Sequence, residues 1–138
     1  MMLRKIIRGF AILPFVALVA APAYAARTAP MYVPEPIQVP AGKNMEAVKK
    51  AIKKACFDKG WESREVGPGH IQAKYTKSGK KESYTAVVDI RYDNKSVRIG
   101  YNNSENLNYD ASAKVIHKTY NNWIHYLERN IRADLGAY

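Results

Sequence analysis

The sequence predicts an α+β fold, a two-layer sandwich in which a four-stranded antiparallel meander carries an N-terminal and a C-terminal helix on one face. Two segments, residues 44–59 and 110–131, repeat apolar side chains at spacings of three and four, as amphipathic helices do. The segment between them alternates apolar and polar residues and is divided by short turn signals, as antiparallel strands are. Residues 44–138 suffice for one modest core, so we expect a single domain.

The first 25 residues have the features of a secretory signal peptide. Arg4, Lys5 and Arg8 give a positively charged start, and residues 10–21 form an uncharged apolar stretch. That stretch is shorter than the roughly 20 residues that a spanning helix needs. Residues 23–25 then read Ala-Tyr-Ala, the small-x-small pattern of a cleavage site. We expect cleavage after Ala25, a periplasmic location, and no transmembrane segment in the cleaved chain.

The chain is basic before and after this cleavage. It has 22 Lys and Arg against 12 Asp and Glu, and loss of three cations leaves 19 against 12, a net charge of +7. For an exported protein the available polyanions are phospholipid head groups, lipopolysaccharide and cell-wall polymers, so no nucleic acid partner is expected. Cys56 is the single cysteine, which excludes an internal disulfide, and its spacing from Ile52 indicates a small buried side chain.

Residues 26–43 read as a spacer. Four prolines interrupt it, at positions 30, 34, 36 and 40, and each fixes φ and removes a backbone donor. Such a segment favours extended polyproline-like backbone over a helix or a central strand. Two alternatives stay open, a stiff tether and a segment that lies along the domain.

The first helix is expected to begin at Asn44, a good N-cap, with Glu46 in the first turn. Gly60 is expected to stop it. Its apolar residues recur at helical spacing, and its lysines fall between them on the solvent side: Met45, Val48, Ile52, Ala55 and Cys56, against Lys49, Lys50, Lys53 and Lys54.

Four strands should follow, at residues 61–66, 70–76, 82–92 and 96–102. A two-residue loop at Ser78-Gly79 would pair Ala73 with Tyr84, and one at Asp93-Asn94 would pair Ile90 with Val97. Both registers place apolar residues opposite apolar residues on one face, and a slip of one residue would destroy this agreement. The same registers predict Asp89 opposite Arg98 on the other face, an opposite-charge pair.

The last helix is expected to begin near Asp110 or Ser112. Its apolar stripe matches the apolar sheet face in kind and length: Ile116, Tyr120, Trp123, Ile124, Leu127 and Ile131. Tyr75, Tyr84 and Tyr101 share the core face of the sheet, so we interpret the tyrosines as core residues with hydroxyls at the rim.

No catalytic or metal-binding pattern is evident. His117 and His125 lie on the polar flanks of the predicted last helix, but no carboxylate or thiolate joins them at the spacing that zinc needs. A triad of Ser112, His117 and Asp110 lacks a nucleophile elbow and an oxyanion-hole motif. We therefore expect no enzyme activity, no cofactor and no metal.

The sheet face turned away from the helices is the candidate binding surface. It should carry Gln72, Lys74, Thr76, Thr85, Val87, Asp89, Arg91, Ser96 and Arg98. Its cations are Lys74, Arg91 and Arg98, and its predicted anion is Asp89. An uncovered face with this charge balance favours an anionic partner.

Trp61 has two alternative positions, set by the turn at residues 67–69. If the turn leaves two residues unpaired, Trp61 lies on the open face beside the cations, where it would be a contact residue. If three residues are unpaired, Trp61 lies beside Tyr75 in the core, the more common environment for a large aromatic side chain. The sequence does not choose between them.

Several motifs resemble those of small exported Gram-negative bacterial proteins of uncharacterised function, many of them predicted lipoproteins. They are Gly60-Trp61, residues 68–73 (PGHIQA), 97–101 (VRIGY), 106–110 (NLNYD) and 120–123 (YNNW). This chain lacks the lipid-acceptor cysteine of the lipoproteins. The resemblance implies a cell-envelope setting and no particular chemistry. The NLNYD segment reads as turn and cap residues, with a recognition loop through Asn106, Asn108 and Tyr109 as the alternative.

These observations predict a non-enzymatic periplasmic accessory or binding protein. Lys74, Arg91, Arg98 and, in one of its two positions, Trp61 would contact an anionic envelope component or another envelope protein. Contact with a membrane surface and formation of a homo-oligomer stay open. The alternative is a self-associating structural module of the envelope, in which the open face or an edge strand pairs with a second copy.

Overall fold

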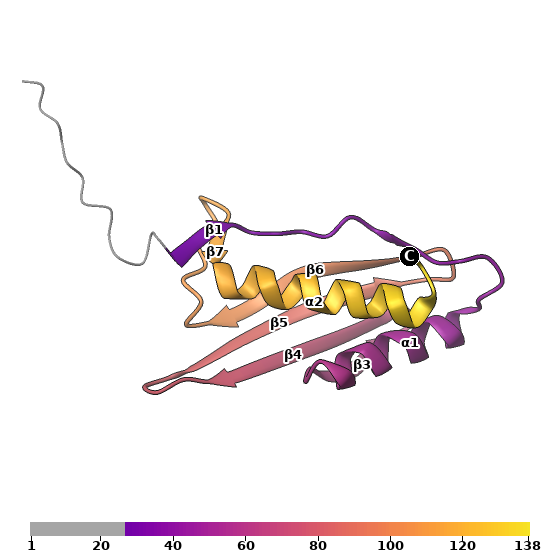
Figure 1. Ribbon diagram of the computed structural model, residues 1–138, viewed down its shortest axis with the longest axis horizontal. Coiled ribbons are helices and arrows are strands. Elements are labelled where there is room, and N and C mark those ends of the chain that lie inside the picture. The colour runs from indigo at the N-terminus through magenta and orange to yellow at the C-terminus, as the bar shows by residue number, and fades with distance from the viewer. Residues whose placement is uncertain (1–26) are drawn as a thin grey trace, which may run out of the picture.

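The computed structural model describes residues 27–138, and the predicted signal peptide, residues 1–25, lies outside them. The elements in chain order are β1 (Thr28–Pro30), β2 (Ile37–Gln38), α1 (Met45–Asp58), β3 (Glu62–Gly67), β4 (His70–Ser78), β5 (Ser83–Tyr92), β6 (Ser96–Glu105), β7 (Val115–His117) and α2 (Lys118–Leu135). The main sheet has the order β2-β6-β5-β4-β3, and β1 pairs with β7 in a second, two-stranded sheet. The α+β class is confirmed, and the sheet has five strands where four were predicted (Figure 1).

Helix α1 forms as its sequence predicts. The Asn44 side chain caps it by accepting a hydrogen bond from Ala47 N at 2.8 Å, and Glu46 lies in the first turn. The chain leaves the helix through Gly60, whose φ of +83° favours a residue without a Cβ. Val48, Ile52 and Cys56 are fully buried against the sheet and α2. Burial raises the pKa of the Cys56 thiol to about 12, so this thiol is protonated and shielded.

The strands face as predicted, but both hairpin registers differ. Ala73 pairs with Val88 in place of Tyr84, because the connection between β4 and β5 spans residues 79–82. Ile90 pairs with Ile99 in place of Val97, because residues 93–95 form the next turn, in which the Asp93 side chain accepts hydrogen bonds from Lys95 N and Ser96 N. Each observed register differs from the predicted one by an even number of residues, so every side chain stays on its predicted face. The predicted pair of Asp89 with Arg98 is wrong, since Asp89 lies opposite Gly100.

The N-terminal segment lies along the domain and is part of it. Ile37 pairs with Val97 at the β6 edge and is fully buried. The Asn121 side chain donates to Pro30 O at 3.0 Å and accepts from Tyr32 N at 2.8 Å, and the Tyr32 hydroxyl donates to Glu128. The prolines restrict the segment to short edge strands, in agreement with their missing donors.

Helix α2 begins at Lys118, several residues later than predicted. Asp110 instead closes a turn, accepting from Ser112 N at 2.9 Å and Ala113 N at 3.1 Å, and Lys114 takes a positive φ of 56° that interrupts helical backbone. The β-branched Val115 and Ile116 then continue into β7. His117 Nδ1 accepts from Thr119 N at 3.0 Å and caps the helix.

Both helices lie over the same face of the main sheet, side by side (Figure 1). One core joins them to that face, with Ile71, Val88 and Ile90 fully buried. Tyr120 is buried, whereas Tyr75, Tyr84 and Tyr101 are half-buried at the rim, as predicted for core tyrosines. None of the helices within residues 27–138 is long and apolar enough to cross a membrane.

Candidate functional site

The open face of the main sheet carries the residues predicted for it. Gln72 pairs with Asp89, Lys74 with Val87, and Thr76 with Thr85, so these side chains share one face. The structure adds residues from β3 and from the end of β6, since Arg64 lies opposite Gln72, Glu62 opposite Lys74, and Glu105 opposite Thr85. The prediction that Asp89 is the only anion on this face is therefore wrong, because Glu62 and Glu105 lie on it as well.

Three basic side chains form one row across β4, β5 and β6. His70 lies opposite Arg91, and Arg91 lies opposite Arg98. Both arginines are exposed, and neither forms an ion pair with any residue in the range 27–138. Like charges placed directly opposite each other destabilise a sheet. The arginine pair therefore has no evident structural purpose. We name these three residues the basic row.

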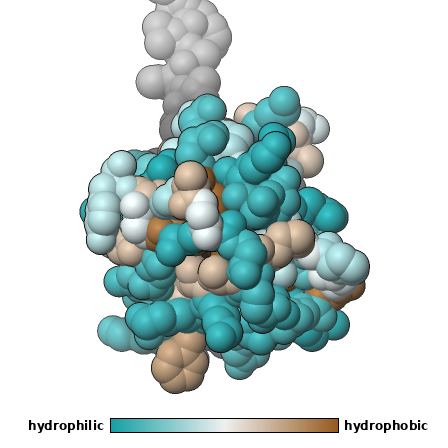
Figure 2. All heavy atoms as spheres, turned by 90° about the vertical axis from the view of Figure 1, so that its right-hand side faces the viewer, coloured by the Kyte–Doolittle hydropathy of each residue, from teal (hydrophilic) through white to brown (hydrophobic). Residues whose placement is uncertain are grey.

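A hollow of about 260 Å³ adjoins the arginines at the end of the sheet where the β3–β4 and β5–β6 turns meet α1. Its basic residues are Arg91 and Arg98 and its one acidic residue is Asp93; the remaining lining residues are Met45, Pro68, Gly69, Tyr92 and Ser96. Figure 2 shows this end of the molecule, where most of the surface is hydrophilic and apolar patches are small. An anion that reaches the arginines would therefore meet a polar environment.

Gly69 sets how closely the β3–β4 turn approaches β5. Its φ is +65°, and a Cβ built on it would lie 2.6 Å from the carbonyl oxygen of Tyr92. The Gly69 carbonyl accepts from Tyr92 N at 2.9 Å. Any other residue here would push the turn away from β5 and change the wall of the hollow.

Asp89 lies beside the basic row, but its charge is already engaged. Its carboxylate accepts from His70 Nε2 at 2.7 Å and from Asn102 Nδ2 at 2.8 Å. Burial acts to raise the pKa of Asp89, but hydrogen bonds from Asn102, His70 and Gln72 together lower it below its ordinary value. The Asp89 carboxylate thus orients His70 and forms no ion pair with Arg91 or Arg98. The acidic residue near Arg98 is Asp93, whose pKa is lowered by hydrogen bonds from the Lys95 and Ser96 amides and by the nearby charges of Lys95 and Arg98.

Replacement of Asp89 by asparagine is expected to remove a pH-dependent part of the stability. A carboxyl with a depressed pKa stabilises the fold above its unfolded pKa, near 4, and loses that contribution as pH falls through the folded value. The variant should lower the free energy of unfolding by about 1 kcal/mol at pH 7 and by less near pH 3. Urea denaturation at the two pH values measures this. An equal loss at both would show that the Asp89 charge does not matter.

The four predicted site residues are only partly brought together. Arg91 and Arg98 are adjacent, as described above. Lys74 shares their face but lies four residues along β4 from His70, opposite Glu62 on one side and Val87 on the other. It is outside the hollow and not part of the basic row.

Trp61 is not on the open face. The turn leaves Glu65 opposite Ile71, with a bulge at Val66, and this register directs Trp61 into the core. Trp61 is 4% exposed, and its ring centroid lies 5.4 Å from that of Tyr75. Of its two alternative positions the core position is the one observed, so Trp61 is excluded as a contact residue of this face.

Sequence reasoning missed His70 and the turn residues of the hollow. Alternation along β4 was a sufficient signal for His70, because Ile71 points to the core and its neighbour must point the other way. The signal for Pro68 and Gly69 was absent, since only the fold brings their turn next to the β5–β6 turn.

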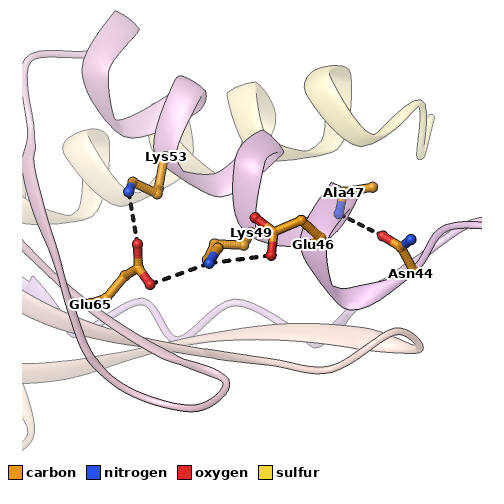
Figure 3. Close-up of polar contacts among 6 residues, drawn as sticks. All are labelled: Asn44, Glu46, Ala47, Lys49, Lys53 and Glu65. Atoms are coloured by element: carbon orange, nitrogen blue, oxygen red, sulfur yellow. Dashed lines mark hydrogen bonds and ion pairs between the residues drawn. The ribbon is translucent and has the colours of Figure 1, made fainter.

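The lysines of α1 do not offer a competing site. Lys49 and Lys53 both bind the Glu65 carboxylate, at 3.3 and 2.9 Å, and Lys49 also lies 3.3 Å from Glu46 (Figure 3). Lys54 pairs with Asp58 at 2.8 Å. These pairs neutralise much of the positive charge of the helix, as expected for a solvated helix face.

The other candidate residues have structural roles. Asn106 and Asn108 take positive φ values of 62° and 53°, and the Asn106 side chain donates to Ser83 O at 2.7 Å, as expected for turn residues. The His125 ring stacks on Tyr32 with centroids 3.8 Å apart. Within residues 27–138, no three His, Cys, Asp or Glu side chains are grouped so that they could hold a metal ion.

Comparison of the chain with models of protein families, with curated proteins and with solved structures finds no match.

Proposed function

We propose that this protein is a non-enzymatic accessory or binding protein of the periplasm that contacts an anionic component of the cell envelope through its basic row. An acidic surface of a protein partner would be held by the same chemistry. The predicted signal peptide supports the setting, and the excess of basic over acidic residues supports the sign of the partner's charge.

The observation that carries the proposal is the opposition of Arg91 and Arg98 across two neighbouring strands. Directly opposed Cβ atoms lie about 5 Å apart, so the two guanidinium groups can bind oxygens of one phosphate or carboxylate group. Such an anion would also relieve the repulsion between the arginines. The fixed fork of N–H donors suits this geometry better than lysine does.

The position of the row supports access by a large ligand. Arg91 and Arg98 are exposed on the face away from both helices, and the adjoining hollow opens at the end of the sheet. His70 extends the row by one strand and is held in place by Asp89. A phosphate on a membrane or polymer can approach such a face without the protein changing shape.

Binding of the purified protein to lipopolysaccharide, to vesicles of anionic phospholipid and to peptidoglycan fragments tests this proposal. We expect saturable binding to at least one of them, and weaker binding as salt is raised from 20 to about 150 mM, because salt screens exposed charges. Absence of binding to all three at low salt would overturn an anionic envelope component as the ligand. Binding that salt leaves unchanged would overturn the electrostatic role of the row.

A further inference from the structure

A second candidate site lies at the opposite end of the sheet, between the outer half of the β4–β5 hairpin and α2. One hollow of about 220 Å³ is lined by Tyr84, Leu107 and Trp123, and a second of about 310 Å³ by Trp61, Tyr75 and Trp123. Lys77 and Trp123 line both hollows, so the two adjoin. We name these two hollows together the aromatic groove. Ligand sites commonly have volumes of about 300–1,000 Å³.

The groove exists because the hairpin is longer than the helix that covers it. β4 has nine residues and is about 30 Å long, whereas the 14 residues of α1 span about 21 Å. The hairpin therefore projects past the end of α1 (Figure 1). Lys77 and Tyr84 form a cross-strand pair on the helix side of this projecting part.

The aromatic rings of the groove suit a hydrocarbon chain better than a sugar. Tyr75 lies between the two tryptophans, with ring centroids 5.4 Å from Trp61 and 4.7 Å from Trp123. Tyr75 is tilted by 36° from Trp61 and meets Trp123 edge to face at 69°, and both tryptophans are buried. These three rings therefore do not form one flat platform, which stacking of a sugar ring requires. Dispersion contacts with a hydrocarbon chain have no such directional requirement.

Cations without acidic partners surround the groove. No Asp or Glu lines either hollow, whereas Lys59 and Lys77 do. The connection that closes the hairpin adds Lys80 and Lys81, with Glu82 as its one acidic residue. None of these four lysines forms an ion pair with any residue that the structure describes. An apolar floor with a cationic rim is complementary to a molecule with a hydrocarbon chain and an anionic head.

We propose that the aromatic groove binds one molecule of an anionic amphiphile, with its chain against Trp123 and Tyr84 and its head group at Lys77 and Lys59. This proposal is independent of the one for the basic row, because the two sites lie at opposite ends of the sheet. Ligand pockets lined by aromatic residues with a few charged groups at fixed places have this form.

The two tryptophans of the chain both line the groove, so their fluorescence reports on it directly. Titration of the purified protein with laurate, below its micellar concentration, should give a saturable change with one molecule bound per chain. Dodecyl maltoside has a chain of the same length and no charge, and it should bind about tenfold more weakly. The exposed substitution Lys77→Glu should weaken laurate binding by about the same factor.

Two matched variants separate this site from other effects of charge. Lys74→Glu makes the same charge change on the same strand but on the opposite face, and Arg98→Glu alters the basic row; both should leave laurate binding unchanged. The proposal would be overturned if laurate gave no saturable fluorescence change or if many molecules bound to each chain. It would also be overturned if the neutral detergent bound with equal affinity, or if Lys74→Glu and Lys77→Glu weakened laurate binding equally. A response to peptidoglycan fragments without one to laurate would overturn the choice of ligand.

Discussion

Replacement of Arg98 by glutamate is expected to weaken binding of the anionic ligand and to stabilise the protein at the same time. The substitution turns the opposed arginines into an opposite-charge pair with Arg91, which contributes about 0.2–1 kcal/mol to the free energy of unfolding. It also removes charge-assisted hydrogen bonds worth about 1.5–3 kcal/mol, which corresponds to a loss of affinity of roughly 10- to 150-fold. Introducing a negative charge would weaken binding further. The double variant Arg91→Glu, Arg98→Glu should show no binding.

A simultaneous loss of binding and gain of stability distinguishes a binding surface from a structural one. Binding is measured with whichever envelope component the native protein binds, and stability by urea denaturation of the same samples. Lys74→Glu is the matched control, because it changes the same charge on the same face outside the basic row. Unchanged binding in the double variant would exclude this face as the binding surface. Loss of stability in Arg98→Glu would show that repulsion from the nearby Asp93 carboxylate outweighs the new pair with Arg91.

The second large effect is expected at Ile37, in the segment ahead of α1. Ile37→Ala should lower the free energy of unfolding by about 2–5 kcal/mol, because it leaves a cavity where a fully buried side chain meets the β6 edge. Such a loss is a large part of the stability of a small domain. The result would show that the segment belongs to the folding unit and is not a tether.

Urea denaturation compares this variant with Val33→Ala in the same segment, where the side chain is 60% exposed. The control should change the free energy of unfolding by no more than about 0.5 kcal/mol. Equal and small effects in both variants would mean that the segment detaches from the domain in solution. In that case the sheet would have four strands, as the sequence alone predicts.

The parts of the fold that depend on periodicity could be predicted from the sequence. The apolar spacing of α1 and the alternation along β4, β5 and β6 determine which side chains face the core, whatever the loop lengths. The registers could not be predicted, because Ser78-Gly79 and Asp93-Asn94 are turn signals that do not specify how many residues remain unpaired. A register error of an even number of residues leaves each side chain on its predicted face, but it changes which charged residues lie opposite each other.

The short pairings were not predictable. β1, β2 and β7 have two or three residues each, too few to show a period, and their partners are distant in the sequence. Ile116 fits the apolar stripe of the predicted helix equally well, and only its pairing with Ala29 shows that it lies in a strand. The pairing of β1 with β7 therefore delays the start of α2.

The candidate site was predictable in composition and not in arrangement. Alternation places Arg91 and Arg98 on one face, but only the observed register makes them neighbours and removes Asp89 from Arg98. The position of Trp61 depended on whether the β3–β4 turn leaves two or three residues unpaired. The bulge at Val66 determines this, and the sequence does not show it. The basic row is thus a property of the registers and not of the sequence pattern.

An amide-resolved NMR titration of the purified protein with lipopolysaccharide, anionic phospholipid and peptidoglycan fragments tests the central claim most directly. Binding through the basic row predicts that the shifted amides cluster at His70, Arg91 and Arg98 and at the Pro68-Gly69 turn beside them. Shifts confined to other parts of the molecule, or no shifts with any of the three ligands, would contradict it.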